Sequence, residues 1–209
     1  MSLEESFTTI FKNNTWKGQQ SKSGIGSDLK NTKFMRTQLI ELINSLNINH
    51  MIDAPCGDFH WMKELLPQLN IKTYLGVDIV KPLIKDNKLK YAIPNKINFK
   101  HMNIVDDILP KTDLIFCRDC LVHLSIANIQ RVLNQFKRSK STYLITTTFT
   151  KRTYNDDIAD GNWRDVNLTM TPFSFPGFIK LINEGCTEGQ GCFPDKSLGL
   201  WKLKDIPWY

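Results

Sequence analysis

The chain has 209 residues, of which 41% are apolar and 23% are charged, and its formal net charge at pH 7 is +6. This composition is typical of a globular domain and excludes a disordered or fibrous chain. The chain contains no run of about 18 apolar residues and starts with acidic and polar residues, so we expect a cytoplasmic protein with neither a membrane span nor a secretion signal.

Neither the positive charge nor the cysteines point to a specialised class of protein. The lysines are spread along the chain rather than packed into one block, so the charge gives little support for a nucleic-acid partner. The cysteines are odd in number and scattered, at positions 56, 117, 120, 186 and 192, which argues against a disulfide framework.

Residues 1–31 are polar, and we interpret them as a lid-like N-terminal segment that precedes one domain over residues 32–209. Within that domain, helical spacing of apolar residues alternates with short apolar runs that fit strands. In chain order these patterns predict a helix over 32–46, a strand over 50–55, a helix over 60–69, a strand over 73–80, a helix over 81–92, strands over 97–104 and 112–119, a helix over 125–139 and a strand over 141–149.

The last third of the chain is predicted to complete the sheet. Residues 151–175 are irregular and rich in aromatic side chains. Pro176 and Gly185 bracket an apolar segment that we predict to be a helix, because proline suits a first helical turn and glycine a C-cap. A short strand-like piece and a strand over 197–206 follow without a helix between them, which predicts an antiparallel hairpin at one sheet edge.

The alternation of strands and helices predicts an α/β fold with a seven-stranded, mostly parallel sheet and helices on both faces. In such a sheet, ligands bind beyond the carboxyl ends of the strands. The residues at these ends are Asp53, Pro55, Cys56, Gly57 and Asp58 after the first strand, Asp78 and Ile79 after the second, Asn103 and Ile104 after the third, and Arg118, Asp119 and His123 after the fourth.

The turn after the first strand reads Asp-Ala-Pro-Cys-Gly-Asp and begins at Asp53. A dinucleotide loop needs G-x-G-x-x-G, because pyrophosphate approaches bare backbone at a helix N-terminus. One glycine and an extra carboxylate instead favour a ligand that is cationic or donates hydrogen bonds. Asp78 lies near the spacing of about 20 residues at which an acid binds ribose hydroxyls. Together these features indicate a nucleoside with a positive centre and no phosphates, as in S-adenosylmethionine.

With these residues the sequence resembles the class I S-adenosylmethionine-dependent methyltransferases. The resemblance implies a Rossmann-like fold, S-adenosyl-L-methionine as cofactor and S-adenosyl-L-homocysteine as product. It implies that Asp53 contacts the amino group of the methionine part, that Gly57 permits close backbone approach, and that Asp78 binds the ribose. It also implies that Asn103 and Ile104 lie against the adenine.

Other parts of the resemblance concern the cofactor pocket wall. Arg118 and Asp119 would stand beside the transferred methyl group, whereas Pro55 and Asp58 replace glycines of the family pattern and make the turn stiffer and more acidic. Arg36 is either a surface cation or a partner for the cofactor carboxylate. The remaining residues expected in the pocket, with ordinary core packing as the alternative for the tryptophans, are Trp16, Cys56, Trp61 and Ile79.

A narrower resemblance rests on four stretches, at residues 13–27, 53–63, 116–125 and 161–168. They look like a bacterial group within the same superfamily whose members often occur among surface-polysaccharide functions. This likeness covers the chain from about Phe11 to Asp205 and implies a sugar or a cell-envelope polysaccharide precursor as the acceptor.

His123 is the candidate general base, with a purely structural histidine as the alternative. Methyl transfer to oxygen requires the acceptor hydroxyl to lose a proton, and an imidazole with a pKa near neutrality suits that step. Asp119 would orient His123 or take the proton itself. Asn155, Trp163 and Arg164 supply polar and stacking groups for a sugar-like acceptor, unless they belong to a plain surface loop.

Cys117, Cys120 and His123 have the spacing of part of a zinc site, but a fourth ligand would have to come from elsewhere, so we predict no metal. Three functions remain open: an O-methyltransferase acting on a small polar acceptor, a nucleic-acid methyltransferase, and a non-catalytic Rossmann-like binding protein. The chain has no [DN]-P-P-[YF] motif after the fourth strand, which disfavours methylation of base amines.

Overall fold

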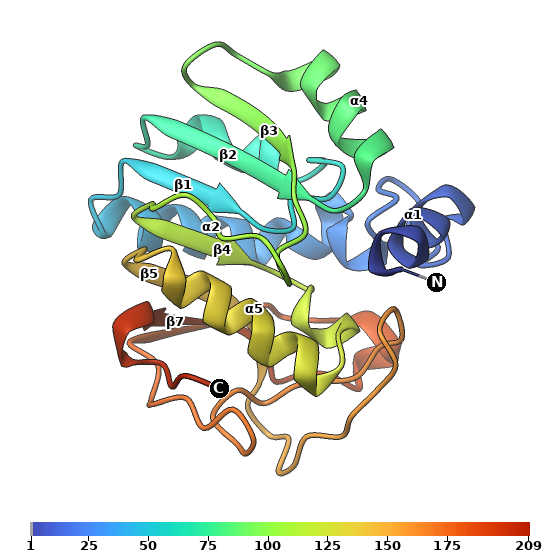
Figure 1. The fold of residues 1–209 in the computed structure, drawn as a ribbon, viewed down its shortest axis with the longest axis vertical. Coiled ribbons are helices and arrows are strands. Elements are labelled where there is room, and N and C mark those ends of the chain that lie inside the picture. Colours follow the sequence, from blue (N-terminus) through green and yellow to red (C-terminus); the bar gives the residue numbers. More distant parts are fainter. Residues whose placement is uncertain (1) are drawn as a thin grey trace.

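The computed structural model describes residues 2–209, which form one seven-stranded sheet flanked by helices (Figure 1). The strands are β1 (His50–Asp53), β2 (Thr73–Asp78), β3 (Ile97–His101), β4 (Leu114–Cys117), β5 (Tyr143–Phe149), β6 (Lys180–Asn183) and β7 (Lys196–Lys202). The α-helices are α1 (Leu3–Asn13), α2 (Leu29–Ser45), α3 (Met62–Leu65), α4 (Lys81–Tyr91) and α5 (Ile126–Arg138). The predicted α/β fold is confirmed.

Strand order places β1 in the middle of the sheet, since the order is β3-β2-β1-β4-β5-β7-β6. The strands from β3 to β5 are parallel, whereas β7 pairs antiparallel with β5 and with β6. Ile52 of β1 stands beside Leu75 of β2 and Ile115 of β4. Because the chain winds outward from β1 in both directions, the topological switch point lies between β1 and β4, where a ligand crevice is expected.

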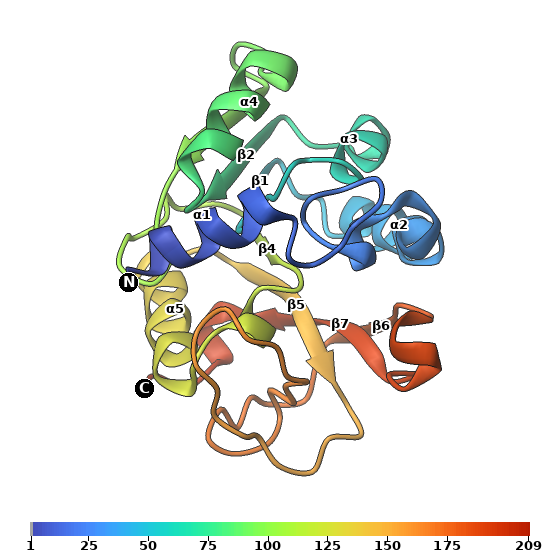
Figure 2. The same cartoon turned by 90° about the vertical axis from the view of Figure 1, so that its right-hand side faces the viewer.

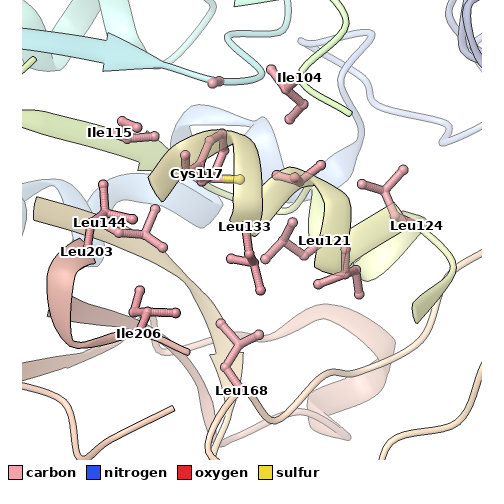
Figure 3. Packing of buried hydrophobic residues seen from close by; sticks show 14 of the residues in the cluster. Ile104, Ile115, Cys117, Leu121, Leu124, Leu133, Leu144, Leu168, Leu203 and Ile206 are labelled. Atoms are coloured by element: carbon pink, nitrogen blue, oxygen red, sulfur yellow. The ribbon is translucent and has the colours of Figure 1, made fainter. Parts of the chain in front are cut away.

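Both faces of the central strands are buried, which explains why β4 (Leu-Ile-Phe-Cys) reads as a continuous apolar run. Leu114 and Phe116 of β4 join the core beneath α2, α3 and α4. Ile115 and Cys117, which alternate with them, join the core beneath α5. Figure 3 shows Leu133 of α5 among the side chains of this second core. Two separate apolar layers therefore hold β4 and its carboxyl end in place.

Helix α5 begins where the sequence predicts. The side chain of Ser125 accepts a hydrogen bond from the Asn128 backbone nitrogen (3.3 Å) and caps the helix. Its apolar stripe, which includes Ile129, Val132 and Phe136, is fully buried against the sheet. The cap and the stripe together fix the start of α5 directly after the turn that follows β4.

The prediction of a helix between Pro176 and Gly185 is wrong. Lys180–Asn183 in this segment forms strand β6 instead. Ile182 pairs with Leu198 of β7 and is buried. Proline and glycine flank strands as well as helices, so the tertiary pairing with β7 decides the conformation here. The predicted antiparallel edge hairpin is confirmed, but β6 forms its first strand in place of the piece expected after Gly185.

Helix α1 gives the N-terminal segment more structure than its polar composition indicates. Ser2 and Glu5 form a capping box, in which each backbone nitrogen donates to the other residue's side chain. Figure 1 places α1 beyond the arrowheads of β1 and β2, and Figure 2 views it lying across that edge of the sheet. Within residues 2–209 no helix is both long and apolar enough to cross a membrane.

Candidate functional site

A cavity lies at the carboxyl ends of β1, β2 and β4 beneath α1, with about 1050 Å³ of empty space that is partly open to solvent. The N-terminal segment, the turn after β1, the ends of β2 and β3, and the turn after β4 all contribute to its walls. Parallel strands end at one edge of a sheet, so residues distant in sequence meet there.

Most of the predicted site residues line this cavity. They are Trp16, Asp53, Pro55, Cys56, Gly57, Asp58, Trp61, Asp78, Ile79, Asn103, Ile104 and Arg118 from the predicted cofactor set, and Asp119 and His123 from the predicted catalytic pair. Four predicted residues do not line it: Arg36, Asn155, Trp163 and Arg164.

Asp53 and Asp78 are buried carboxyls in this cavity. The Tyr74 hydroxyl donates to Asp53 Oδ2 (2.7 Å). The backbone nitrogens of Val80 and Gly57 donate to Asp78, at 2.9 and 3.2 Å. Within residues 2–209 neither carboxyl forms a salt bridge. The fold therefore orients both groups and leaves them without a cation.

Burial raises the pKa of Asp53 to about 8, although the hydrogen bond from Tyr74 opposes this shift. Burial also raises the pKa of Asp78 to about 6, against the hydrogen bonds from the Val80 and Gly57 backbone. A cation or a strong hydrogen-bond donor in the cavity would stabilise the ionised carboxylates. The cavity thus selects for ligands that carry positive charge or hydroxyl groups.

Asp58 ties the N-terminal segment to the turn after β1. Its carboxylate accepts hydrogen bonds from the Ser21 hydroxyl (2.8 Å) and the Lys22 backbone nitrogen (2.9 Å). Gly57 has a positive φ of 52°, and a Cβ there would lie 2.3 Å from Ser23 Oγ. The glycine is therefore required by the close approach of the N-terminal segment as well as by its left-handed backbone.

Replacing Asp58 with alanine is expected to free this segment. Loss of a hydrogen bond to a charged acceptor costs about 1.5–3 kcal/mol, so exchange of the Lys22 amide hydrogen should accelerate by about tenfold or more. Hydrogen exchange read by NMR measures this. The exposed Asp86 of α4 provides the matched control, Asp86→Ala. Equal Lys22 exchange in both variants would contradict the anchoring role.

A network of buried charges stands behind the turn after β4. Arg118 Nη2 donates to Glu184 Oε2 (2.6 Å) and to the Gly26 carbonyl oxygen (3.1 Å). Lys196 Nζ donates to Asp119 Oδ2 (2.8 Å) and to Glu188 Oε1 (3.1 Å). The Arg118 contacts and the Lys196 contacts form one network, because Arg118 Nη1 lies 3.2 Å from the same Asp119 oxygen that Lys196 binds. Strand β7, strand β6 and the N-terminal segment are thereby joined to one wall of the cavity.

This network decides the charge of Asp119. Burial opposes its ionisation, but Arg118 and Lys196 outweigh burial and hold the pKa of this carboxyl below its ordinary range. Asp119 is consequently a fixed negative charge at neutral pH and a poor proton acceptor. Of the two roles predicted for Asp119, this geometry favours orienting and stabilising a neighbour over taking the proton.

His123 has the arrangement of a neutral imidazole with one free nitrogen. Its Nδ1 lies 2.8 Å from the carbonyl oxygen of Asn162 and donates a hydrogen bond to it, so in the neutral ring Nε2 keeps a lone pair. The ring stacks on Trp16, with centroids 4.6 Å apart and planes 28° apart. Burial lowers the pKa of His123, against the Asn162 contact and the charge of Asp119. His123 is therefore unprotonated at neutral pH and able to accept a proton.

Two of the residues outside the cavity are arginines with other partners. Arg36 of α2 donates from Nη2 to the Leu29 carbonyl oxygen (3.2 Å) and does not reach the cavity. Arg164 donates to the backbone oxygens of Leu121 (2.9 Å) and Leu124 (2.7 Å). Arg164 thus fixes the turn that carries His123, and its role in contacting an acceptor stays a prediction.

Asn155 and Trp163 also make structural contacts. The Asn155 amide donates to the carbonyl oxygens of Asn167 (3.0 Å) and Thr171 (2.9 Å). Trp163 packs edge-on against Phe149, with ring centroids 6.0 Å apart. These contacts fold the segment after β5 upon itself and onto that strand, so its polar groups are used internally rather than presented to the cavity.

Several lining residues were not predicted. Leu3, Phe7 and Phe11 of α1 give the cavity an apolar roof, and their spacing of about one helical turn was available as a signal in the sequence. Lys22 and His60 add two basic groups, and the buried Nε2 of His60 has no hydrogen-bond partner within residues 2–209. No sequence signal singled out these two residues.

The cysteines do not assemble a metal site. Cys117 is buried in the α5 core, as its position on the strand predicts. In the part of the chain that the structure describes, no three His, Cys, Asp or Glu side chains gather closely enough to hold a metal ion.

Comparison with known proteins rests on structure alone, since no protein-family model and no curated protein sequence matches the chain. Human N-acetylserotonin methyltransferase in complex with SAM matches 97% of this chain and 60% of its own, with a TM-score of 0.63 and 13% identity. The N-methyltransferase NodS from Bradyrhizobium japonicum matches 84% of this chain and 97% of its own, with a TM-score of 0.58 and 15% identity.

A third similar structure is an S-adenosylmethionine-dependent methyltransferase from Clostridium acetobutylicum, which matches 84% of this chain and 92% of its own, with a TM-score of 0.56 and 15% identity. This chain spans only 60% of the length of the human enzyme. At these identities the likeness concerns the fold, which is the Rossmann-like fold of methyltransferases.

Proposed function

We propose that this chain is an S-adenosylmethionine-dependent methyltransferase that methylates a hydroxyl oxygen of a small acceptor. The observation that carries the proposal is one cavity in which two buried, unpaired carboxyls, Asp53 and Asp78, stand with an unprotonated histidine, His123. The similar structures support it, because they are methyltransferases of the same fold and the human enzyme was crystallised with SAM.

The lining residues fit the cofactor by chemistry. Asp53 would hold the ammonium group of the methionine part, and Asp78 the ribose hydroxyls. Ile79 and Ile104 would pack on the adenine, with Asn103 at its edge; the Asn103 side-chain oxygen already accepts from the Val105 backbone nitrogen (3.1 Å) and has a second lone pair.

The carboxylate of the methionine part needs a basic partner. Lys22 and the unpartnered His60 Nε2 supply it in place of Arg36, which lies outside the cavity. With Lys22 bound to Asp58 through its backbone, residues 1–31 would act as a lid that closes over the bound cofactor on domain 32–209.

His123, Asp119 and Trp16 would have separate roles in the methyl transfer. When bound, S-adenosylmethionine supplies an electrophilic methyl group on a sulfonium sulfur. His123 Nε2 would accept the proton of the acceptor hydroxyl, and the Nδ1 contact with Asn162 holds the ring in the required tautomer. The fixed negative charge of Asp119 would stabilise the imidazolium that forms. Trp16, stacked on His123, provides a flat face on which to orient the acceptor.

For the acceptor we propose a sugar hydroxyl or a related cell-envelope polysaccharide precursor. A sugar ring stacks well on an aromatic face such as Trp16, and the resemblance to polysaccharide-associated proteins agrees with it. A nucleic-acid acceptor is disfavoured, because binding a phosphate backbone needs a continuous basic surface. In the described part of the chain, Lys22 brings only a single unpaired ammonium group to the cavity. The presence of Asp119 and His123 together in the cavity argues against a non-catalytic binding protein.

The proposal is tested by transfer of a labelled methyl group from S-adenosylmethionine to a panel of free sugars, nucleotide sugars, phenols and tRNA. Incorporation into a sugar or nucleotide sugar at a hydroxyl position is expected. Incorporation into tRNA alone would contradict the acceptor class, and incorporation into none of them together with no binding of the cofactor would contradict the enzyme class.

Binding of S-adenosylhomocysteine is expected to release a proton, because its ammonium group favours ionised Asp53. The free carboxyl has a pKa of about 8, so affinity should fall by up to about tenfold per pH unit as the pH drops below that value. Calorimetry between about pH 6 and about pH 9 in two buffers with different ionisation enthalpies measures both effects. Asp53→Asn should remove the pH dependence of the affinity. A wild-type affinity that rises as the pH falls would contradict the role of Asp53.

A further inference from the structure

A second cavity lies at the opposite edge of the sheet, near the amino ends of β2 and β3, with about 920 Å³ of empty space that is partly open to solvent. It is bounded by α3 and the turn after it on one side and by the C-terminal end of α4 on the other. It shares no described lining residue with the cavity beneath α1, so the two are distinct sites.

The walls of this second cavity are aromatic and aliphatic. Phe59 and Tyr74 belong to the buried core behind the cavity, and the ring centroid of Phe59 lies 5.2 Å from that of Tyr91. The partly exposed Tyr91 and Ile97 and the exposed Ile93 supply the apolar surface that a ligand can reach. Apolar and aromatic linings are the usual setting for a small organic ligand.

The rim of the cavity is basic. Four lysines line it, namely Lys63, Lys72, Lys90 and Lys96, and none of its described lining residues is acidic. Within residues 2–209 none of the four ammonium groups has a carboxylate within salt-bridge distance or a side-chain hydrogen bond. Four unpaired cations around an apolar pocket produce a positive potential that attracts anions.

We infer that this second cavity is a binding site for a small organic anion. The flat apolar body of the anion lies against Tyr91, Ile93 and Ile97, and its carboxylate, sulfonate or phosphate is held by the surrounding lysines. The apolar walls account for affinity, and the lysines account for selection of the anion over a neutral molecule of the same shape. The site is independent of the function proposed for the cavity beneath α1.

The test uses three probes that distinguish the contribution of the ligand's aromatic body from the contribution of its negative charge. 1-Anilinonaphthalene-8-sulfonate has an aromatic body and a sulfonate, N-phenyl-1-naphthylamine has the same body without the charge, and sodium sulfate supplies the charge without the body. Fluorescence titration should give one site for the sulfonate, with the neutral analogue at least about tenfold weaker and sulfate a weak competitor.

Two double variants locate the site. Lys63→Ala with Lys96→Ala should weaken binding of the sulfonate about tenfold, whereas Lys85→Ala with Lys88→Ala removes the same charge from exposed positions of α4 outside the cavity and should change it less than about twofold. Equal weakening in both variants, no weakening in either, or a neutral analogue that binds as tightly as the sulfonate would overturn the inference.

Discussion

Replacing Lys196 with methionine is expected to lower the free energy of unfolding by about 3–5 kcal/mol, the cost of breaking a buried ion pair from one side. The ammonium group lies 2.8 Å from Asp119 and 3.8 Å from Glu184, and Lys196 is only 6% exposed. Methionine fills most of the same volume, so the loss reflects charge rather than packing. Urea denaturation followed by circular dichroism measures the change.

The matched control is Lys202→Met, because Lys202 lies on the same strand but is exposed. It should change the free energy of unfolding by less than about 0.5 kcal/mol. The loss in Lys196→Met should also be smaller at acid pH. The pKa of Asp119 is depressed in the folded protein, so the stability it contributes is present at neutral pH and is lost as the pH falls through that depressed value. A variant as stable as the control at neutral pH would refute the network.

The second large effect is expected for His123→Ala, which should reduce turnover by about a hundredfold to ten-thousandfold once an acceptor is known, the usual contribution of a general base. Binding of S-adenosylhomocysteine should change little, because Asp53 and Asp78, the proposed anchors of the cofactor, are positioned by Tyr74, Val80 and Gly57 rather than by His123. Single-turnover kinetics and calorimetry on the same preparation separate the two quantities.

His50→Ala serves as the control for this prediction, since His50 starts β1 at the amino end of the sheet, away from the cavity. With the cofactor saturating, the wild-type rate should be constant at neutral pH and fall only in acid, because burial lowers the pKa of His123 and its neutral form is the active one. If His123→Ala keeps the wild-type rate and pH profile, His123 is a structural residue and another group takes the proton.

The parallel part of the fold could be predicted from the sequence because local signals agree with the tertiary structure there. The strand-end residues Asp53, Asp78 and Arg118 were identified from their positions alone, since parallel strands bring their carboxyl ends to one edge. The cap at Ser125 and the apolar stripe of α5 were equally readable. In these regions the secondary-structure propensity of the residues, the hydrophobic pattern and the sheet topology all predict the same structure.

Helix α1 has local signals, a capping box and an apolar stripe, but its polar surroundings obscured both. The other parts depend on contacts between distant residues that no local pattern contains. Strand β6 carries helix-like flanks and takes its conformation from pairing with β7. Lys196 and Glu184 are joined to the site by contacts across the sheet edge. For Arg36 and Arg164, residue type suggested a ligand, whereas backbone oxygens nearby became their partners.

The central claim is that the cavity beneath α1 binds S-adenosylmethionine through Asp53 and Asp78, and calorimetric titration with S-adenosylhomocysteine tests it most directly. Asp78→Asn keeps the shape of the side chain and should weaken binding about tenfold to a hundredfold, as loss of charged hydrogen bonds requires. Asp86→Ala, at an exposed position, should bind like the wild type. Micromolar binding by the wild type with this difference between the variants is the predicted result. No binding below millimolar concentration, or equal affinity in Asp78→Asn and the wild type, would contradict the claim.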